Sequence, residues 1–200
     1  VHGLMQDHPL LISTLIRHAA ANHGGREIVS RLGDGSIHRT NYSAVERRSR
    51  RLAVALESRG IRPGDRVATL AWNSYRHLEC FYGVSGMGAV LHTVNPRLFH
   101  EQIEYIIRHA EDRVLFFDAD LLPIVESIAP RIGRVEHFVV LCERAQLPQS
   151  GGLRLEAYED WIDAGRDDYV WPEFDERTAS SLCYTSGTTG NPKGVLYSHR

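Results

Sequence analysis

Hydroxyl and glycine residues that could hold a phosphate group gather near the end of the chain, in the stretch from Cys183 to Val195. Glycine lets a backbone adopt positive φ and approach a ligand closely. Successive backbone N–H groups turned to one side form a concave site for an anion. The candidate binding residues are Thr185, Ser186, Gly187, Thr188, Thr189, Gly190 and Lys193. Their types and spacing indicate a loop that binds a polyphosphate.

Lys193 closes this stretch and is the only lysine among the 23 lysine and arginine residues. An ammonium on a flexible stem can follow a phosphate as it moves, whereas a planar guanidinium prefers a fixed bidentate partner. At about 4 Å and an effective dielectric near 20, its attraction to one opposite charge is roughly 4 kcal/mol. Lys193 is therefore our candidate catalytic residue. A glycine-, serine- and threonine-rich surface turn with an incidental lysine remains the alternative.

The stretch does not have the pattern of a nucleoside-triphosphatase P-loop. That pattern places Gly-Lys-Ser/Thr five positions after its first glycine and continues into a helix. Here Pro192 stands five positions after Gly187, and Gly194 and a strand-like run follow the lysine. The G-x-G-x-x-G pattern is also absent. A different nucleotide chemistry is indicated.

Residues 184–195 resemble, without interruption, the AMP-binding signature of the acyl-adenylate-forming enzymes. This superfamily includes acyl-CoA synthetases, luciferases and peptide-synthetase adenylation domains. Further upstream, residues 5–12, 93–103 and 109–112 resemble the medium- and long-chain fatty-acyl-CoA ligase branch. The resemblance runs nearly end to end but covers only the first part of such an enzyme.

The resemblance implies that residues 1–200 are an incomplete N-terminal, AMP-binding domain of an acyl-CoA synthetase, and that the C-terminal domain is absent from this chain. A fatty acid, ATP and coenzyme A would be the substrates, with acyl-AMP formed first and the thioester second. The loop from Thr185 to Gly190 would cradle the β- and γ-phosphates, with Lys193 balancing their charge. Thr185 would help place Mg²⁺ together with a glutamate beyond Arg200, and the CoA site would also lie outside this chain. Some fatty-acyl ligases are homodimers, and we expect the same here by analogy alone.

Two other functions remain open. An adenylating relative could pass its acyl group to a carrier-protein thiol, or oxidise it, without coenzyme A. A truncated or decayed domain could hold nucleotide without turnover. The segment from Thr93 to Ile103 favours the CoA ligase, because it resembles that branch.

Composition narrows the class of protein. A hydrophobic content of 42% provides for a buried core, and a formal net charge of −2 gives no electrostatic footprint for nucleic acid. Three widely spaced cysteines form neither a disulfide framework nor a metal site, so we expect a reducing, cytoplasmic compartment. No apolar run approaches the roughly 18 residues of a membrane span. The chain begins at Val1 and ends at Arg200 without a closing element, and we expect a fragment.

Strand-like and helix-like segments alternate with short links, which predicts an α/β fold with a parallel-rich sheet covered by helices on both faces. The expected strands are 27–31, 36–40, 66–72, 89–94, 114–117, 135–141, 179–184 and 195–197. The expected helices are 9–22, one from 43 that stops before Gly60, 75–86, 102–109, 121–132 and 158–164.

Three local features of the helices follow from the pattern. Ser43 and Glu46 have the spacing of a capping box. On the second helix, Val45, Ser49, Leu52, Ala53 and Leu56 share an inward face, whereas Arg47, Arg50 and Arg51, with Arg48 at the flank, form a solvated face. On the third helix, Leu78, Phe81, Tyr82 and Ser85 are expected to point inward.

Other candidate residues are assigned structural roles. His18, His23, His77, His100 and His109 lie on helices or at helix ends without metal-ligand spacing, so they are expected to be surface or hydrogen-bonded residues. His199 could start a helix or contact a ligand. Cys183 is expected to be a small buried residue. Residues 95–97 follow a strand at the edge where α/β sheets form clefts, although the family resemblance favours a structural loop.

Overall fold

The computed structural model describes residues 1–5, 7–185 and 191–200. The strands are β1 (Glu27–Arg31), β2 (Ile37–Asn41), β3 (Arg66–Leu70), β4 (Val90–Val94), β5 (Val114–Phe117), β6 (His137–Val140), β7 (Leu155–Ala157), β8 (Ala179–Thr185) and β9 (Lys193–Ser198). The α-helices are α1 (Ile12–His23), α2 (Tyr42–Ser58), α3 (Tyr75–Gly86), α4 (His100–Ala110), α5 (Leu122–Ile128) and α6 (Tyr158–Ala164).

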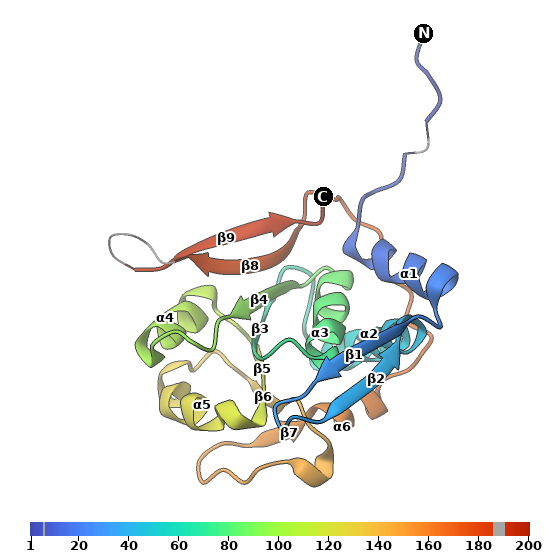
Figure 1. Cartoon of the computed structure of the whole chain (residues 1–200). Coiled ribbons are helices and arrows are strands. Elements are labelled where there is room, and N and C mark those ends of the chain that lie inside the picture. Colours follow the sequence, from blue (N-terminus) through green and yellow to red (C-terminus); the bar gives the residue numbers. More distant parts are fainter. Residues whose placement is uncertain (6, 186–190) are drawn as a thin grey trace.

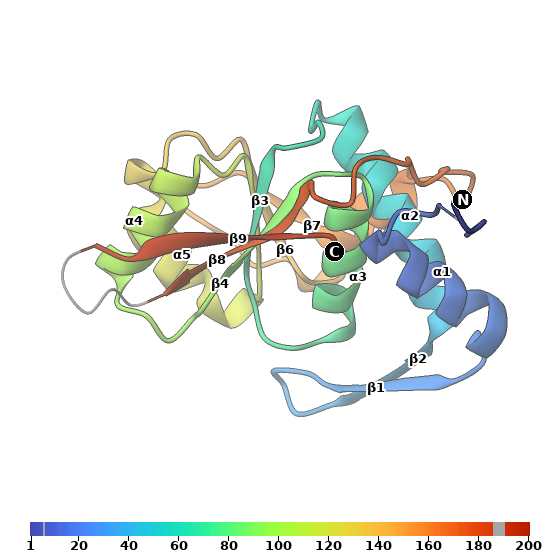
Figure 2. The ribbon, with the colours of Figure 1, turned by 90° about the horizontal axis from the view of Figure 1, so that it is seen from above.

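Within the described residues, seven strands form one sheet in the order β7-β6-β5-β3-β4-β8-β9. Neighbouring strands from β7 to β8 are parallel, and β9 alone runs antiparallel, along β8. Every residue of β5 is buried, as expected for a parallel strand covered on both faces. The predicted α/β class and parallel-rich sheet are confirmed. β1 and β2 form a separate antiparallel ribbon that projects beside the body of the molecule (Figure 2).

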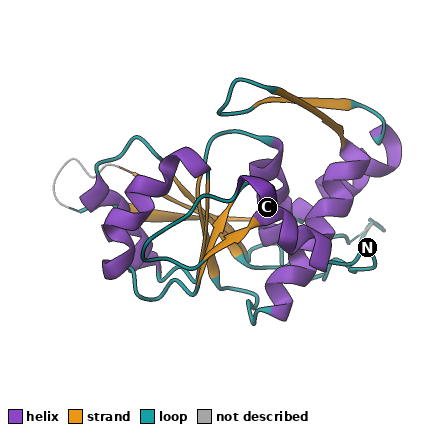
Figure 3. Ribbon diagram, turned by 90° about the horizontal axis from the view of Figure 1, so that it is seen from below, coloured by secondary structure: helices purple, strands orange, loops and turns teal. Residues whose placement is uncertain are grey.

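Helices cover both faces of the sheet, as predicted. α4 and α5 lie together on one face, and α2, α3 and α6 lie on the other (Figure 1). Figure 3 shows the strands between these two groups of helices. β4 lies on one side of β3 in the sheet and β5 lies on the other, so the connection from β3 to β4 and the connection from β4 to β5 run in opposite directions. Because such connections are right-handed, α3 and α4 lie on opposite faces of the sheet. Val67 and Phe116 belong to one core, and Leu70 and Phe117 to the other.

The predicted inward face of α3 is only partly correct. Ser85 is buried and the half-buried Phe81 packs against the core, but Leu78 and Tyr82 are only half-buried. The buried face instead carries Arg76, at 7% exposure, and Glu79, at 0%. Hydrophobic periodicity could not identify this face, because the two charges are buried only where their partners come from other helices.

Those partners also make the predicted solvated face of α2 wrong. Arg48 donates to Glu79, at 2.7 Å, and to Glu159 on α6, at 2.9 Å. Arg50 donates to the carbonyl of Tyr169, and Arg51 to the carboxylate of Asp167. Of the four arginines, only Arg47 is exposed. The segment that follows β7 covers the others, which local sequence around α2 does not reveal. The expected inward face of α2 is confirmed, since all five residues of it are buried.

Local details differ in three further places. Asn41, not Ser43, caps α2 by accepting from the amide of Ala44 at 2.9 Å. The helix expected over 121–132 is split into α5 and two flanking 3₁₀ turns, the second of which contains Pro130. The short strand β7 was not predicted. No helix among the described residues has both the length and the apolar character needed to span a membrane.

Candidate functional site

The hairpin formed by β8 and β9 carries the phosphate-binding candidates at its closed end. Thr185, the last residue of β8, pairs with Lys193, the first residue of β9. Cross-strand partners have Cβ atoms about 4.5–5.5 Å apart and project from the same face. The structure therefore brings a hydroxyl and the only lysine together at the two ends of the loop. Both residues are exposed, and Lys193 makes no ion pair with any described residue. The other candidates, Ser186, Gly187, Thr188, Thr189 and Gly190, lie outside the described residues.

A cleft of about 590 Å³ lies beside this hairpin. Its walls include Trp72 and Asn73 after β3, residues 95–97 after β4, and Cys183 and Tyr184 at the end of β8. These three parallel strands end at the same edge of the sheet, and α3 and α4 leave that edge toward opposite faces. This arrangement is the topological switch point at which open α/β sheets bind ligands. Residues 95–97 therefore line the cleft expected from their place in the sequence.

Aromatic and cationic side chains face this cleft. The Arg97 guanidinium lies 5.9 Å from the centre of the Trp72 ring, within the range of a cation–π contact. His77 Nε2 lies 3.1 Å from the Thr69 hydroxyl, so its predicted role as a hydrogen-bonded histidine is confirmed. Burial lowers the pKa of His77. Cys183 is half-buried, which corrects its predicted burial.

Tyr184 directly precedes Thr185, and its side chain contacts α4. Its hydroxyl lies 2.7 Å from Nδ1 of His109. Burial, and next the Asp112 carboxyl, raise the pKa of Tyr184 to about 12. The phenol therefore stays protonated near neutral pH and can donate to the imidazole. His109 thus has the hydrogen-bonded role predicted for it, but its partner is a residue of the motif.

Sequence reasoning missed a buried acid–base pair next to Tyr184. His92 on β4 and Asp112 after α4 are both 0% exposed, with Nδ1 and Oδ2 2.6 Å apart. Burial raises the pKa of Asp112, and the hydrogen bond from His92 opposes that effect. His92 stands at an inward position of a buried strand, where a polar residue needs a partner. That position was the available signal, but the partner, 20 residues later, depends on the tertiary fold.

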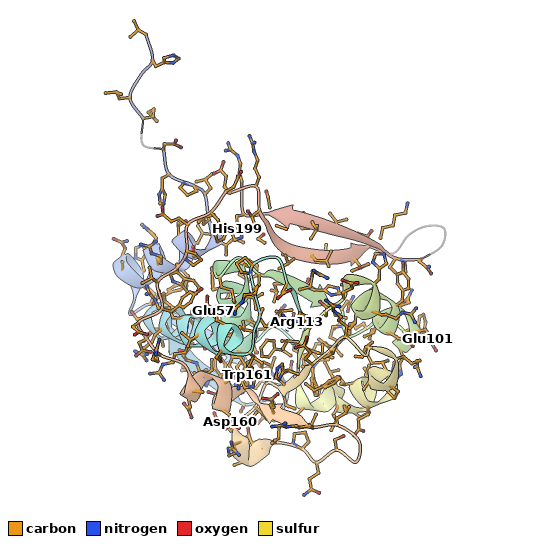
Figure 4. The ribbon with its side chains drawn as sticks, turned by 180° about the vertical axis from the view of Figure 1, so that it is seen from behind. Glu57, Glu101, Arg113, Asp160, Trp161 and His199 are labelled. Carbon is orange, nitrogen blue, oxygen red and sulfur yellow. The ribbon has the colours of Figure 1, made fainter. Side chains whose placement is uncertain are left out.

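His199 ties the base of the hairpin to the first helix. Its Nδ1 accepts from the amide of Ile12 at 3.2 Å, and Figure 4 shows it near the start of α1. The side chain is 9% exposed. This contact joins the two ends of the described chain. The predicted helix-start role and the predicted ligand contact both stay predictions.

The described donor set suits a phosphate better than a resident metal. A hydroxyl and an ammonium offer a donor and a positive charge to phosphate oxygens. Mg²⁺ binds through one or two carboxylates together with substrate phosphates and water. The described part of the chain contains no group of three or more histidine, cysteine, aspartate or glutamate side chains placed to hold a metal. The Thr185 hydroxyl fits Mg²⁺ only as one ligand of a set completed by ATP and by a carboxylate, and that role stays a prediction.

Comparison with known proteins places this geometry in a family. The 3-methylmercaptopropionyl-CoA ligase of Ruegeria lacuscaerulensis is 56% identical over 99% of this chain, which spans 37% of that protein. The medium-chain-fatty-acid–CoA ligase of Ectopseudomonas oleovorans is 52% identical over 99% of this chain and 36% of its own length. The solved anthranilate CoA ligase AuaEII, in complex with anthranoyl-AMP, superposes with a TM-score of 0.81 at 29% identity, over 98% of this chain and 36% of that one.

This chain therefore spans just over a third of the length of these relatives. A family model described as AMP-binding enzyme matches residues 16–200, which include the hairpin and the whole seven-stranded sheet. On that match, the chain belongs to the family of AMP-binding enzymes.

Proposed function

We propose that residues 1–200 are the incomplete N-terminal, AMP-binding domain of a longer ATP-dependent acid–CoA ligase. The carboxylate of the acid would attack the α-phosphorus of ATP, giving acyl-AMP and pyrophosphate. The thiol of coenzyme A would then displace AMP and form the thioester. The observation that carries this proposal is the pairing of Thr185 with Lys193 beside the cleft at the carboxyl edge of β3, β4 and β8.

The role of the hairpin in this reaction is electrostatic. Negative charge develops on the departing pyrophosphate, and preorganised donors aimed at that charge lower the barrier. Hydroxyls and amides from Thr185 to Gly190 would hold the β- and γ-phosphates, and Lys193 would balance their charge. Mg²⁺, when bound with ATP, would neutralise phosphate oxygens, with Thr185 as one of its ligands. The residue before Pro192 is restricted to extended conformations, which stiffens the exit of the loop toward Lys193.

We propose a medium- or long-chain fatty acid as the substrate. The support is the resemblance of residues 93–103 to that branch, together with relatives named as medium- and long-chain ligases at 52% and 50% identity. A relative named as a ligase for an acyl-carrier protein is less similar, at 32% identity. A short thioether acid is the competing substrate, because the 56% identical relative is named for one.

A substrate panel tests this proposal. The full-length protein would be incubated with ATP, Mg²⁺, coenzyme A and acids from 3-methylmercaptopropionate to palmitate, with pyrophosphate release and acyl-CoA measured for each. We expect the highest kcat/KM for a fatty acid of at least eight carbons. A higher kcat/KM for the thioether acid would show that the proposed fatty-acid substrate is wrong. If no acid led to pyrophosphate release, the proposed ligase function itself would be refuted.

The chain by itself is expected to make no acyl-CoA. The groups that would hold adenine, ribose and coenzyme A are, by the family resemblance, outside residues 1–200. Mass spectrometry that detected acyl-CoA made by this chain alone would contradict that division of the enzyme. We further propose a cytoplasmic enzyme, and homodimerisation stays a prediction that sedimentation of the full-length protein would check.

A further inference from the structure

Tyr184 connects the phosphate-binding candidates to the body of the domain. Along β8 it is the neighbour of Thr185, and across the hairpin it pairs with Gly194, the neighbour of Lys193. A Cβ at Gly194 would lie 3.2 Å from Cζ of Tyr184, so the absence of a side chain there lets the ring pass over the partner strand. Tyr184 is therefore adjacent, along one strand and across to the other, to the residues at both ends of the loop.

Two histidines fix the ring from the other side. The Tyr184 hydroxyl and His109 Nδ1 are 2.7 Å apart, and the two rings meet edge to face with centres 5.8 Å apart. The His92 ring lies 5.2 Å from that of Tyr184. α4, which carries His109, lies below the loop-bearing end of the hairpin (Figure 1). The phenol is thus held at its hydroxyl and along its face.

The contact between His92 and Asp112 requires conformations and burial that are energetically unfavourable. Glu111, between α4 and Asp112, adopts the left-handed conformation with φ 55°, which is unfavourable for a residue other than glycine. That turn brings Asp112 back toward β4, where Oδ2 meets His92 Nδ1 at 2.6 Å. His92 Nε2 and Asp112 Oδ1 have no hydrogen-bond partner among the described residues, although both are fully buried. A hydrophobic pair would fill the same space without these penalties, so hydrophobic packing alone does not account for the pair.

We propose that Tyr184 is a positioning residue for adenylation, held by His109 and backed by the buried pair of His92 and Asp112. This inference rests on the proposed function. The hydrogen bond and the ring contacts set the place of Thr185 and Lys193, which would contact the phosphates in the proposed function. A shift of about 1 Å in a group that holds a substrate can cost about a hundredfold in rate, so a fixed hairpin has a direct catalytic value.

The first test removes the Tyr184 hydroxyl and leaves its ring. In the full-length enzyme, Tyr184→Phe should lower kcat for pyrophosphate release by about two- to tenfold, the range for one lost hydrogen bond. The matched control is Tyr169→Phe, whose hydroxyl donates to Glu57 at 3.0 Å far from the hairpin. Both variants lose one tyrosine hydrogen bond and should lose similar thermal stability. Only Tyr184→Phe should have a lower kcat, and equal kcat values in the two variants would overturn the proposal.

The second test asks whether Tyr184 and His109 act through one bond. His109→Ala should lower kcat as Tyr184→Phe does, and the double variant should be no slower than the slower single variant. His109→Asn, which keeps an acceptor near Nδ1, should restore part of the rate. Rates that multiply in the double variant would overturn the shared role. Wild-type enzyme that releases no pyrophosphate would instead refute the proposed function, so the two failures are distinguishable.

Discussion

At the residue scale, Lys193 is the proposed catalytic residue, and its own type and near neighbours were enough to identify it as a candidate. Its type and spacing were enough to propose a phosphate contact, and the structure pairs it with Thr185 across the hairpin. His92 and Asp112 differ in this respect. Nothing in their sequence neighbourhoods indicates that a strand and a helix end bring them within 2.6 Å. A single residue is predictable when its function depends on local neighbours, and not when it depends on a distant partner.

Lys193→Ala in the full-length enzyme should slow adenylation by on the order of 10- to 150-fold. A hydrogen bond to a charged group contributes roughly 1.5–3 kcal/mol, and each 1.36 kcal/mol is about a factor of ten in rate. Pyrophosphate release under saturating ATP is the measurement. Arg177→Ala, which removes an exposed cation just before β8, is the control and should leave the rate within about twofold. An unchanged rate in Lys193→Ala would refute the role assigned to the ammonium.

At the element scale, the glycine at the end of α3 is required by the close packing of another segment against the helix. A Cβ on Gly86 would lie 2.5 Å from the ring of Trp171, which follows α6 by several residues. Trp171 is 5% exposed, and its Nε1 donates to Glu46 at 3.1 Å, so the ring has little freedom to move away. Close packing against this ring therefore accounts for the glycine at position 86. The identity of the partner was not available from the sequence, because Trp171 lies 85 positions downstream.

Gly86→Ala should therefore destabilise the chain by about 1–3 kcal/mol, the usual cost of overpacking. In an open helix the same change would be stabilising by roughly 1 kcal/mol, because alanine favours helix. The sign of the effect thus reports the contact with Trp171. Gly133→Ala is the control, since a Cβ there would meet nothing within 4 Å. Urea unfolding of both variants is the measurement, and a stabilised Gly86→Ala would show that the close contact is absent.

At the scale of the whole molecule, a network of buried charges joins three helices. Arg48 on α2 contacts Glu79 on α3 and Glu159 on α6, and Arg76 contacts Glu159 at 2.7 Å. The Tyr158 hydroxyl donates to Glu79 at 2.9 Å. Burial raises the pKa of Glu79 to about 7, while Arg48 opposes that shift. This network fixes which faces of the helices meet, and it makes stability depend on pH.

The sign of this dependence follows from proton binding. Between its ordinary pKa of 4.5 and about 7, Glu79 binds more protons in the folded chain than in the unfolded chain. Its contribution to stability is therefore fully present below pH 4.5 and is lost as pH rises through 7. The free energy of unfolding of the wild type, relative to Glu79→Gln, should fall by up to about 3 kcal/mol over this range.

Urea titrations of both proteins at several pH values would measure that difference. Comparing the pair removes the opposite contribution of Glu159, whose pKa is lowered by its bonds to Arg48 and Arg76 against the effect of burial. Glu173→Gln, at an exposed loop position, is the control for the loss of a surface carboxylate. A pH-independent difference for Glu79→Gln would contradict the raised pKa.

Features that depend on near neighbours along the chain could be predicted from the order of the amino acids. The strand Val114–Phe117 and the helix Tyr158–Ala164 were predicted with the bounds observed, because apolar runs and periodicity are local properties. The α/β class followed from the same local patterns, whereas the stretch from Tyr184 to Val195 was identified by its resemblance to a family signature. Tertiary structure alone decided which charged residues are buried and which histidine supports the hairpin. Burial of Arg76, Glu79 and His92 is favourable only when a partner from another element offsets the loss of hydration, and that partner exists only once the chain has folded.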